Sequence, residues 1–148
     1  RKGAGPRTKP VGIAGQRALV RLRSKGAAVL LKVAGASGLA ILHLSSTQQG
    51  AELWFSLDDV PDWTTLRETL TGDDTIEIEE GFGAVSVVGD AIGADATRTA
   101  AILDLLQAVG TAVEAINTSH LRVTLFCARE GVDPLVTLLH AKLVEQGP

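Results

Sequence analysis

Three histidines and a single cysteine are the side chains of this 148-residue chain to consider first as zinc ligands or as a thiol nucleophile. His43, His120 and His140 do not have the spacing of zinc ligands, and one cysteine is too few for a zinc cluster. Cys127 lies within the apolar segment LRVTLFCAR, without the spacing of a catalytic triad. We therefore expect Cys127 to be a small buried hydrophobe and the histidines to lie at strand ends or on helix surfaces. The sequence predicts no metal site and no catalytic residue.

A pair of glycines faintly suggests a phosphate-binding loop. Gly89 and Gly93 precede a helix expected to begin at Asp95, but no glycine-rich loop followed by Lys-Ser/Thr occurs in the chain. A flexible turn is the simpler interpretation, although free N–H groups at that helix start could hold a carboxylate. We expect no cofactor in this segment.

Charge is distributed unevenly along the chain, whose net charge is -3. No acidic residue precedes Glu52, whereas nine basic residues do. These are Arg1, Lys2, Arg7, Lys9, Arg17, Arg21, Arg23, Lys25 and Lys32. Such asymmetry can mark a surface for nucleic acid or membrane. No aromatic residues are interleaved with the basic ones, so we favour two halves that face each other, or a basic end that meets a missing partner domain.

Composition indicates a globular protein of the cytoplasm. The apolar fraction is 45% and the aromatic fraction 3%, so the core must consist of Val, Leu, Ile and Ala. No apolar run approaches the roughly 18–20 residues needed to cross a bilayer, and no secretory leader is recognisable. A lone cysteine suits a reducing compartment. Because the chain begins at Arg1 and lacks Met, we expect a fragment of a larger protein.

Hydrophobic periodicity predicts two successive strand–helix–strand–strand–helix units after an extended lead-in. The expected strands are 18–23, 39–44, 52–57, 75–80, 84–88, 113–116 and 121–127. The expected helices are 27–34, 62–70, 95–108 and a closing helix from 133 onward. Asp62 and Asp95 are expected N-caps, and Asp133 is an expected cap before Pro134. The offset of about seventy residues between the units indicates a repeat with antiparallel sheets.

Several short motifs resemble the tandem ACT repeats of aspartate kinases. The most telling is IEIEEGFGAVSVVGD at residues 76–90, which is similar to the junction between the two repeats of lysine-sensitive or bifunctional members. Ser24-Lys25-Gly26 resembles the turn into the first helix, and Thr118-Ser119 resembles a dipeptide of the second repeat. The resemblance implies an α+β fold of two ferredoxin-like βαββαβ domains: a lead-in at 1–16, a first repeat at 17–80 and a second at 81–148. It also implies intertwined repeats, with a strand from the second repeat completing the first sheet.

The resemblance implies a regulatory function. In that family the repeats bind an amino-acid end product, lysine or threonine, and inhibit a separate kinase domain that uses ATP and Mg. We therefore expect a non-catalytic homodimeric segment whose parent chain is an aspartate kinase. A free-standing tandem ACT regulator and a βαββ nucleic-acid binder are the alternatives. The sequence upstream of Arg1 separates the first two, and salt-sensitive retention on a polyanion would favour the third.

The resemblance also places candidate effector residues. In the first repeat these are Ser24, Gly26, Ala27, Ala28, Leu42, His43, Thr47 and Gln48. In the second repeat they are Asp90, Ile92, Asn117, Thr118 and Ser119. His43 stands where lysine-sensitive members have an acidic residue, and no acid precedes Glu52. We therefore expect threonine to bind better than lysine at the first repeat. A neutral effector, a degenerate site and an acid supplied by the other repeat all remain open.

Overall fold

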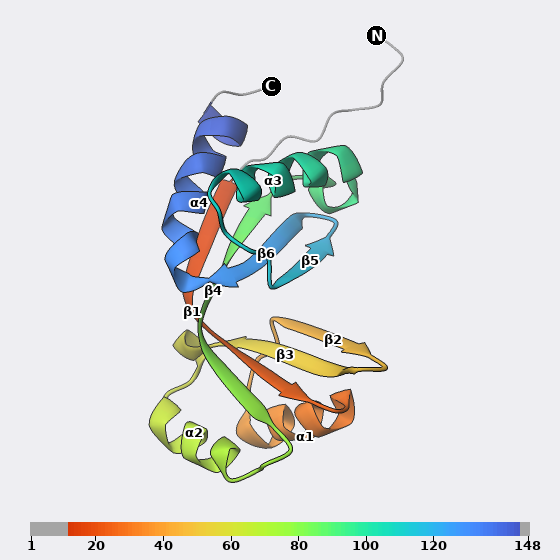
Figure 1. Ribbon diagram of the computed structural model, residues 1–148, viewed down its shortest axis with the longest axis vertical. Coiled ribbons are helices and arrows are strands. Elements are labelled where there is room, and N and C mark those ends of the chain that lie inside the picture. Colours follow the sequence, from red (N-terminus) through yellow and green to blue (C-terminus); the bar gives the residue numbers. More distant parts are fainter. Residues whose placement is uncertain (1–11, 146–148) are drawn as a thin grey trace. The chain divides into compact units, whose positions relative to one another are not determined.

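The structure, a computed structural model, describes residues 12–145 and confirms the repeated order of strands and helices (Figure 1). The strands are β1 Gly12–Ser24, β2 His43–Thr47, β3 Gly50–Ser56, β4 Glu77–Val88, β5 Ala115–Ser119 and β6 Arg122–Ala128. The helices are α1 Ala27–Ser37, α2 Trp63–Thr71, α3 Ala96–Ala108 and α4 Val132–Leu139. Short turns of helix are η1 Leu57–Asp59, η2 Ile92–Ala94, η3 Arg129–Gly131 and η4 His140–Glu145. Within residues 12–145, no helix combines the length and the apolar character that a membrane crossing requires.

The six strands follow the order β2-β3-β1-β4-β6-β5, and the neighbouring strands pair antiparallel. The chain divides into two compact units, one formed by residues 18–82 and the other by the remainder. We call them the first unit and the second unit. The long strands β1 and β4 each contribute one segment to each unit, so each unit has four strands and two helices. This is the expected α+β arrangement of two ferredoxin-like domains.

The two repeats are intertwined as expected, but the strands that they exchange differ from the expectation. We expected residues 1–16 to be a lead-in and a strand of the second repeat to complete the first sheet. Instead, residues 12–17 are the first half of β1 and belong to the second unit. Because Gly and Ala make up half of residues 12–17, the sequence lacks the alternation of apolar and polar residues that predicts a strand. Gly15 has a packing reason, because a Cβ there would lie 2.9 Å from Val132 Cγ1. Residues 1–11 lie outside the described part of the chain.

The core of the first unit lies between one face of the sheet and helices α1 and α2. Val20 of β1 pairs with Phe55 of β3, and Leu22 pairs with Leu53, so their side chains share one face. Leu30 of α1 packs on this face and is fully buried. The remaining buried members are Ala34, Ala51, Leu70 and Ile76. Each fully buried large apolar side chain contributes about 1.5–3 kcal/mol to folding.

The second unit has an equivalent core built around β4 and β6. Its buried members include Val85, Val87, Ile102, Leu106, Val123, Leu125, Leu135 and Leu139. Cys127 is among them, as expected from its apolar surroundings. Burial raises the pKa of the Cys127 thiol to about 11, and the charge of Glu114 adds to the effect. The thiol is therefore protonated at neutral pH, which makes it a poor nucleophile.

Some element boundaries differ from the sequence prediction. The strand expected at 39–44 begins at His43, because Leu39 N–H donates to the Ala34 carbonyl (2.9 Å) and closes the end of α1 with Gly38 in the left-handed region. The strand expected at 113–116 is Ala115–Ser119. Asp133 is not the cap of α4: Gly131 occupies that position, and Asp133 instead pairs with Arg17.

Gly81-Phe82-Gly83 was expected to interrupt two strands, but β4 runs through it without a break. Gly81 has φ +88°, a conformation that side chains rarely adopt, and it shifts the alternation of side chains along the strand. Glu79 and Phe82, three residues apart, consequently contact the same side chain, Arg21. Gly83 is required for packing, since a Cβ there would lie 2.4 Å from Val132 Cγ2.

Candidate functional site

The start of helix α1 is open to an anionic ligand. Gly26 is its N-cap with φ -145° and ψ 151°, no side chain caps the helix, and its first turn holds no acidic residue. By contrast, the Asp62 carboxylate accepts a hydrogen bond from Thr65 N at the start of α2 (3.1 Å), and Asp95 accepts from Arg98 N at the start of α3 (2.9 Å). Free N–H groups at a helix start attract negative charge.

An open cleft of about 940 Å³ in the first unit adjoins this helix start. It is formed by the end of β1, the start of α1, the β2–β3 hairpin and the segment leading into β4. The lining residues are Arg23, Ser24, Lys25, Val29, Ser45, Thr47, Gln49, Gly50, Ala51, Glu52, Asp74, Thr75 and Glu77. Arg23 pairs with Glu52 across β1 and β3, and Glu52 pairs with Ser45 across β3 and β2. These three side chains therefore form one row on the sheet face opposite the helices.

Both signs of charge meet in the cleft. Arg23 and Lys25 supply positive charge near the start of α1, while Glu52, Asp74 and Glu77 supply three carboxylates. The sequence argument considered only the turn into α1 and the second strand, and the carboxylates of the cleft come from other segments. The turn into α1 and strand β2 indeed supply none, but β3 and the segment before β4 do.

The predicted residues of the first repeat lie in and beside the cleft. Ser24 and Thr47 line it. Gly26, Ala27 and Ala28 lie between two lining residues, Lys25 and Val29. Gln48 is not part of the wall, whereas its neighbour Gln49 is.

Leu42 and His43 lie outside the cleft wall. Leu42 N–H donates to the Trp54 carbonyl (2.9 Å), and His43 pairs with Trp54 at the start of β2. Burial lowers the pKa of the half-buried His43, and the charge of Glu52 opposes this shift. His43 thus occupies a strand end, as expected, one row of side chains from Glu52.

In the second unit, the position equivalent to the cleft of the first unit is occupied by the connection between β4 and α3. The connection from β4 to α3 is longer than that from β1 to α1 and contains η2. Ile92 is fully buried in the core, and a Cβ on Gly93 would lie 1.6 Å from the Ser119 carbonyl oxygen. The glycine that suggested a phosphate-binding loop therefore has a packing origin. Asp95, moreover, already caps α3.

The second-repeat candidates consequently do not form a site like that of the first unit. Asp90 is exposed, and its Oδ1 lies 3.4 Å from His120 Nε2, whereas Ile92 belongs to the core. Asn117, Thr118 and Ser119 lie on β5, at the edge of the sheet. Within residues 12–145, no three His, Cys, Asp or Glu side chains cluster as metal ligands.

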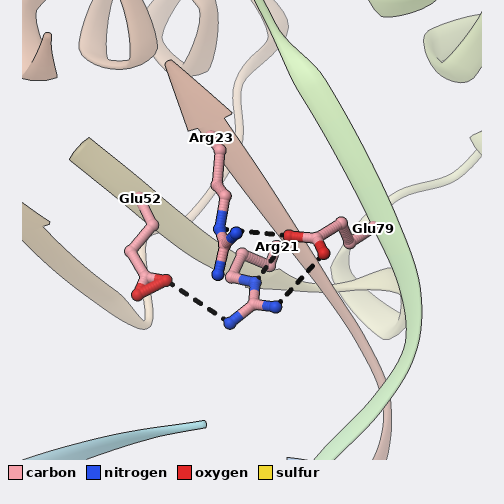
Figure 2. A network of polar contacts seen from close by, with 4 residues as sticks. All are labelled: Arg21, Arg23, Glu52 and Glu79. Carbon is pink, nitrogen blue, oxygen red and sulfur yellow. Dashed lines mark hydrogen bonds and ion pairs between the residues drawn. The ribbon is translucent and has the colours of Figure 1, made fainter. Parts of the chain in front are cut away.

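A buried polar cluster that sequence reasoning missed lies beside the cleft (Figure 2). Arg21 is only 4% exposed, and its guanidinium donates to both oxygens of Glu79 (Nε–Oε1 2.8 Å, Nη2–Oε2 3.2 Å). Its Nη1 lies 3.5 Å from Oε2 of Glu52, and Arg23 Nε lies 3.2 Å from Glu79 Oε1. The alternation in ALVRLR and TIEIEE put these residues on strands, but it could not show which strands pair.

Aromatic rings enclose the Arg21 guanidinium. Its central carbon lies 5.1 Å from the ring centroid of Trp54 and 4.7 Å from that of Phe82, distances typical of cation–π contacts. The two rings contact each other edge to face, with centroids 5.1 Å apart. Two carboxylates and two aromatic rings thus offset the cost of burying the Arg21 charge.

Much of the described basic charge is thus neutralised locally. Arg17 pairs with Asp133 within the second unit, while Arg21 and Arg23 pair with Glu79 within the first. These three arginines of the basic part thus pair with acidic residues from later in the chain, whereas Arg1, Lys2, Arg7 and Lys9 lie outside the described residues.

Comparison with known proteins decides the fold. No protein-family model and no curated protein matches the sequence. The regulatory subunit of aspartate kinase from Thermus thermophilus superimposes with a TM-score of 0.73 at 17% identity, over 89% of this chain and 96% of that one. The fold is the tandem ACT fold of aspartate kinase regulatory domains. The fold implied by the sequence resemblance is therefore confirmed.

The same tandem ACT fold forms part of longer enzymes. The aspartate kinase of Clostridium acetobutylicum gives a TM-score of 0.75 at 16% identity, covering 91% of this chain and 35% of that one. E. coli aspartokinase III in complex with lysine and aspartate gives 0.69 at 15% identity, covering 96% and 35%. The chain therefore spans about a third of these kinases but nearly all of the Thermus regulatory subunit.

Proposed function

We propose that this chain is a regulatory amino-acid-binding module of an aspartate kinase, acting in the cytoplasm in feedback inhibition by lysine. The observation that carries the proposal is the uncapped start of α1 beside a cleft that holds both signs of charge. The tandem ACT fold supports it, as does the lysine complex of E. coli aspartokinase III.

The cleft matches the three charges of lysine. The ligand carboxylate would bind at Lys25 and the free N–H groups of α1, while the two ammonium groups would face Glu52, Asp74 and Glu77. Opposite charges 4 Å apart attract by about 4 kcal/mol at an effective dielectric constant of 20. Threonine has no second ammonium group and would leave the additional carboxylates unused. We therefore reverse the order expected from the sequence and propose that lysine binds better than threonine.

Subunit association is the second part of the proposed function. β2 and β5 are the terminal strands of the sheet, and unpaired edges favour pairing with another chain. Helix α1 also exposes Val29 (37%), which lines the cleft, and Leu31 (42%). We propose a homodimer that acts on an aspartate kinase catalytic domain. Light scattering of the purified chain at tens of micromolar would show a dimer, and a strict monomer would contradict this part.

Calorimetric titration with matched ligands tests the lysine site. We expect L-lysine to bind with one site per chain. Norleucine, which lacks the side-chain ammonium group, and 1,5-diaminopentane, which lacks the carboxylate, should each bind at least tenfold more weakly. Equal affinity for lysine and norleucine would show that the carboxylates of the cleft do not select the ligand.

A pair of lysine variants locates the site. Lys25 lines the cleft just before helix α1 begins, whereas Lys32 is exposed within α1, away from the wall. Lys25→Gln should weaken lysine binding about fivefold, the equivalent of one solvent-exposed ion pair, and Lys32→Gln should leave it unchanged. Equal effects of the two substitutions would place the ligand elsewhere.

A further inference from the structure

Glu52 faces two environments at once. It lines the cleft, and its side chain remains 19% exposed. Its Oε2 is nevertheless buried, lies 3.5 Å from Arg21 Nη1 and accepts no hydrogen bond within the described part of the chain. A buried carboxylate oxygen without a hydrogen bond is held weakly, because the full stabilisation of the charge is not realised. Of the two carboxylates that hold Arg21, Glu52 is therefore the one that can respond to a change in the cleft.

Arg21 connects Glu52 to the end of the first unit. The guanidinium packs on Phe82, which is the last residue of β4 in the first unit. From Gly83 onward the same strand belongs to the second unit. The position of Phe82 depends on Gly81, whose left-handed backbone turns the ring toward Arg21 and Trp54. Figure 2 shows how Glu52 and Glu79 approach Arg21 from strands β3 and β4.

We propose that Glu52, Arg21 and Phe82 form a coupling path by which the charge in the cleft is sensed at the strand that leaves the first unit. A cation bound in the cleft would compete with Arg21 for Glu52. The ion pair between Arg21 and Glu52 would then weaken, so the contact of the Arg21 guanidinium with Phe82 would change. The identity of the cation rests on the proposed function, whereas the coupling is a property of the chain without ligand.

The coupling is tested without ligand by neutralising one carboxylate at a time. Glu52→Gln keeps the shape of the side chain and removes its charge. Glu77→Gln removes a charge from the same cleft wall, and no ion pair joins Glu77 to Arg21 in the described chain. We expect hydrogen exchange of the Phe82 and Gly83 amides, measured by NMR on the whole chain, to be about tenfold faster in Glu52→Gln, as follows from losing one charged contact. Glu77→Gln should match the unsubstituted chain.

Two results would overturn the coupling path. One is exchange at Phe82 and Gly83 within twofold of the unsubstituted chain in Glu52→Gln, and the other is equal acceleration by Glu77→Gln. Should Glu52→Gln fail to fold, Glu52→Asp keeps the charge but withdraws it from Arg21, and the same acceleration is expected.

The calorimetric experiment separates this inference from the proposed function. Faster exchange in Glu52→Gln, with no lysine binding to the unsubstituted chain, would leave the coupling intact and refute the proposed ligand. Lysine binding to the unsubstituted chain, with unchanged exchange in Glu52→Gln, would support the ligand and refute the coupling.

Discussion

Replacing Gly93 with alanine tests the contact that fills the second unit where the first unit has a cleft. A Cβ at this position would lie 1.6 Å from the Ser119 carbonyl oxygen, 2.7 Å from the Ser119 carbonyl carbon and 3.0 Å from the Arg122 carbonyl oxygen. Ordinary contact begins at 3.4 Å, so η2 or the turn between β5 and β6 must move by about 2 Å. All three atoms belong to the backbone, so no side-chain rotation can relieve the clash.

We expect Gly93→Ala to lower the free energy of unfolding by about 3 kcal/mol, at the upper end of overpacking effects. For a chain of this size that corresponds to a melting temperature about 6–12 °C lower. Urea unfolding followed by circular dichroism measures the change. Gly35→Ala is the matched control: nothing lies within 4 Å of its Cβ, and alanine in the helix interior should add about 0.5–1 kcal/mol. If Gly93→Ala unfolds at the same urea concentration as the unsubstituted chain, the tight contact between η2 and β5–β6 is refuted.

Three further results are expected. Gly26→Val should still fold, because its backbone is extended and nothing lies within 4 Å of a Cβ, although Val is a poorer N-cap than Gly. The variant should lose the thermal shift caused by lysine, and an unchanged shift would remove the start of α1 from the site. Because the pKa of His43 is lowered in the folded chain, the unfolded chain takes up a proton first as the pH falls through about 6.5. The free energy of unfolding should therefore decline below that pH. His43→Gln should reduce this decline, as measured by urea titrations at several pH values. Cys127 should resist thiol reagents at pH 8 in the native chain and react fully in denaturant; rapid native labelling would contradict its burial.

Local signals in the sequence predicted the helices well. Asp62 and Asp95 were recognised as caps, and both side chains accept the hydrogen bond expected of that position. Such signals involve residues three or four positions apart, so they can be read without knowledge of the fold. The same holds for the buried position of Cys127, which follows from its apolar neighbours.

The contents of the cleft could not be predicted in this way. Asp74 and Glu77 reach it from about fifty residues beyond Ser24, and Glu52 does so through the pairing of β3 with β1. These contacts depend on strand pairing between distant segments, for which a single sequence carries little information. The strand at 12–17 was missed for a related reason, because its partner β4 lies about seventy residues further along the chain.

The strand exchange described above has a consequence for synthesis on the ribosome. The first unit is one uninterrupted stretch, 18–82, so all of its strands and helices can assemble once Phe82 has emerged. The second unit combines residues 12–17 with the residues from Gly83 onward. Its first strand is therefore made early but must wait for β4, β6 and α4 before its apolar side is covered. Chains fold vectorially as they are made, and contacts between distant segments form slowly. Residues 12–17 thus wait longer for their partners than any strand of the first unit does.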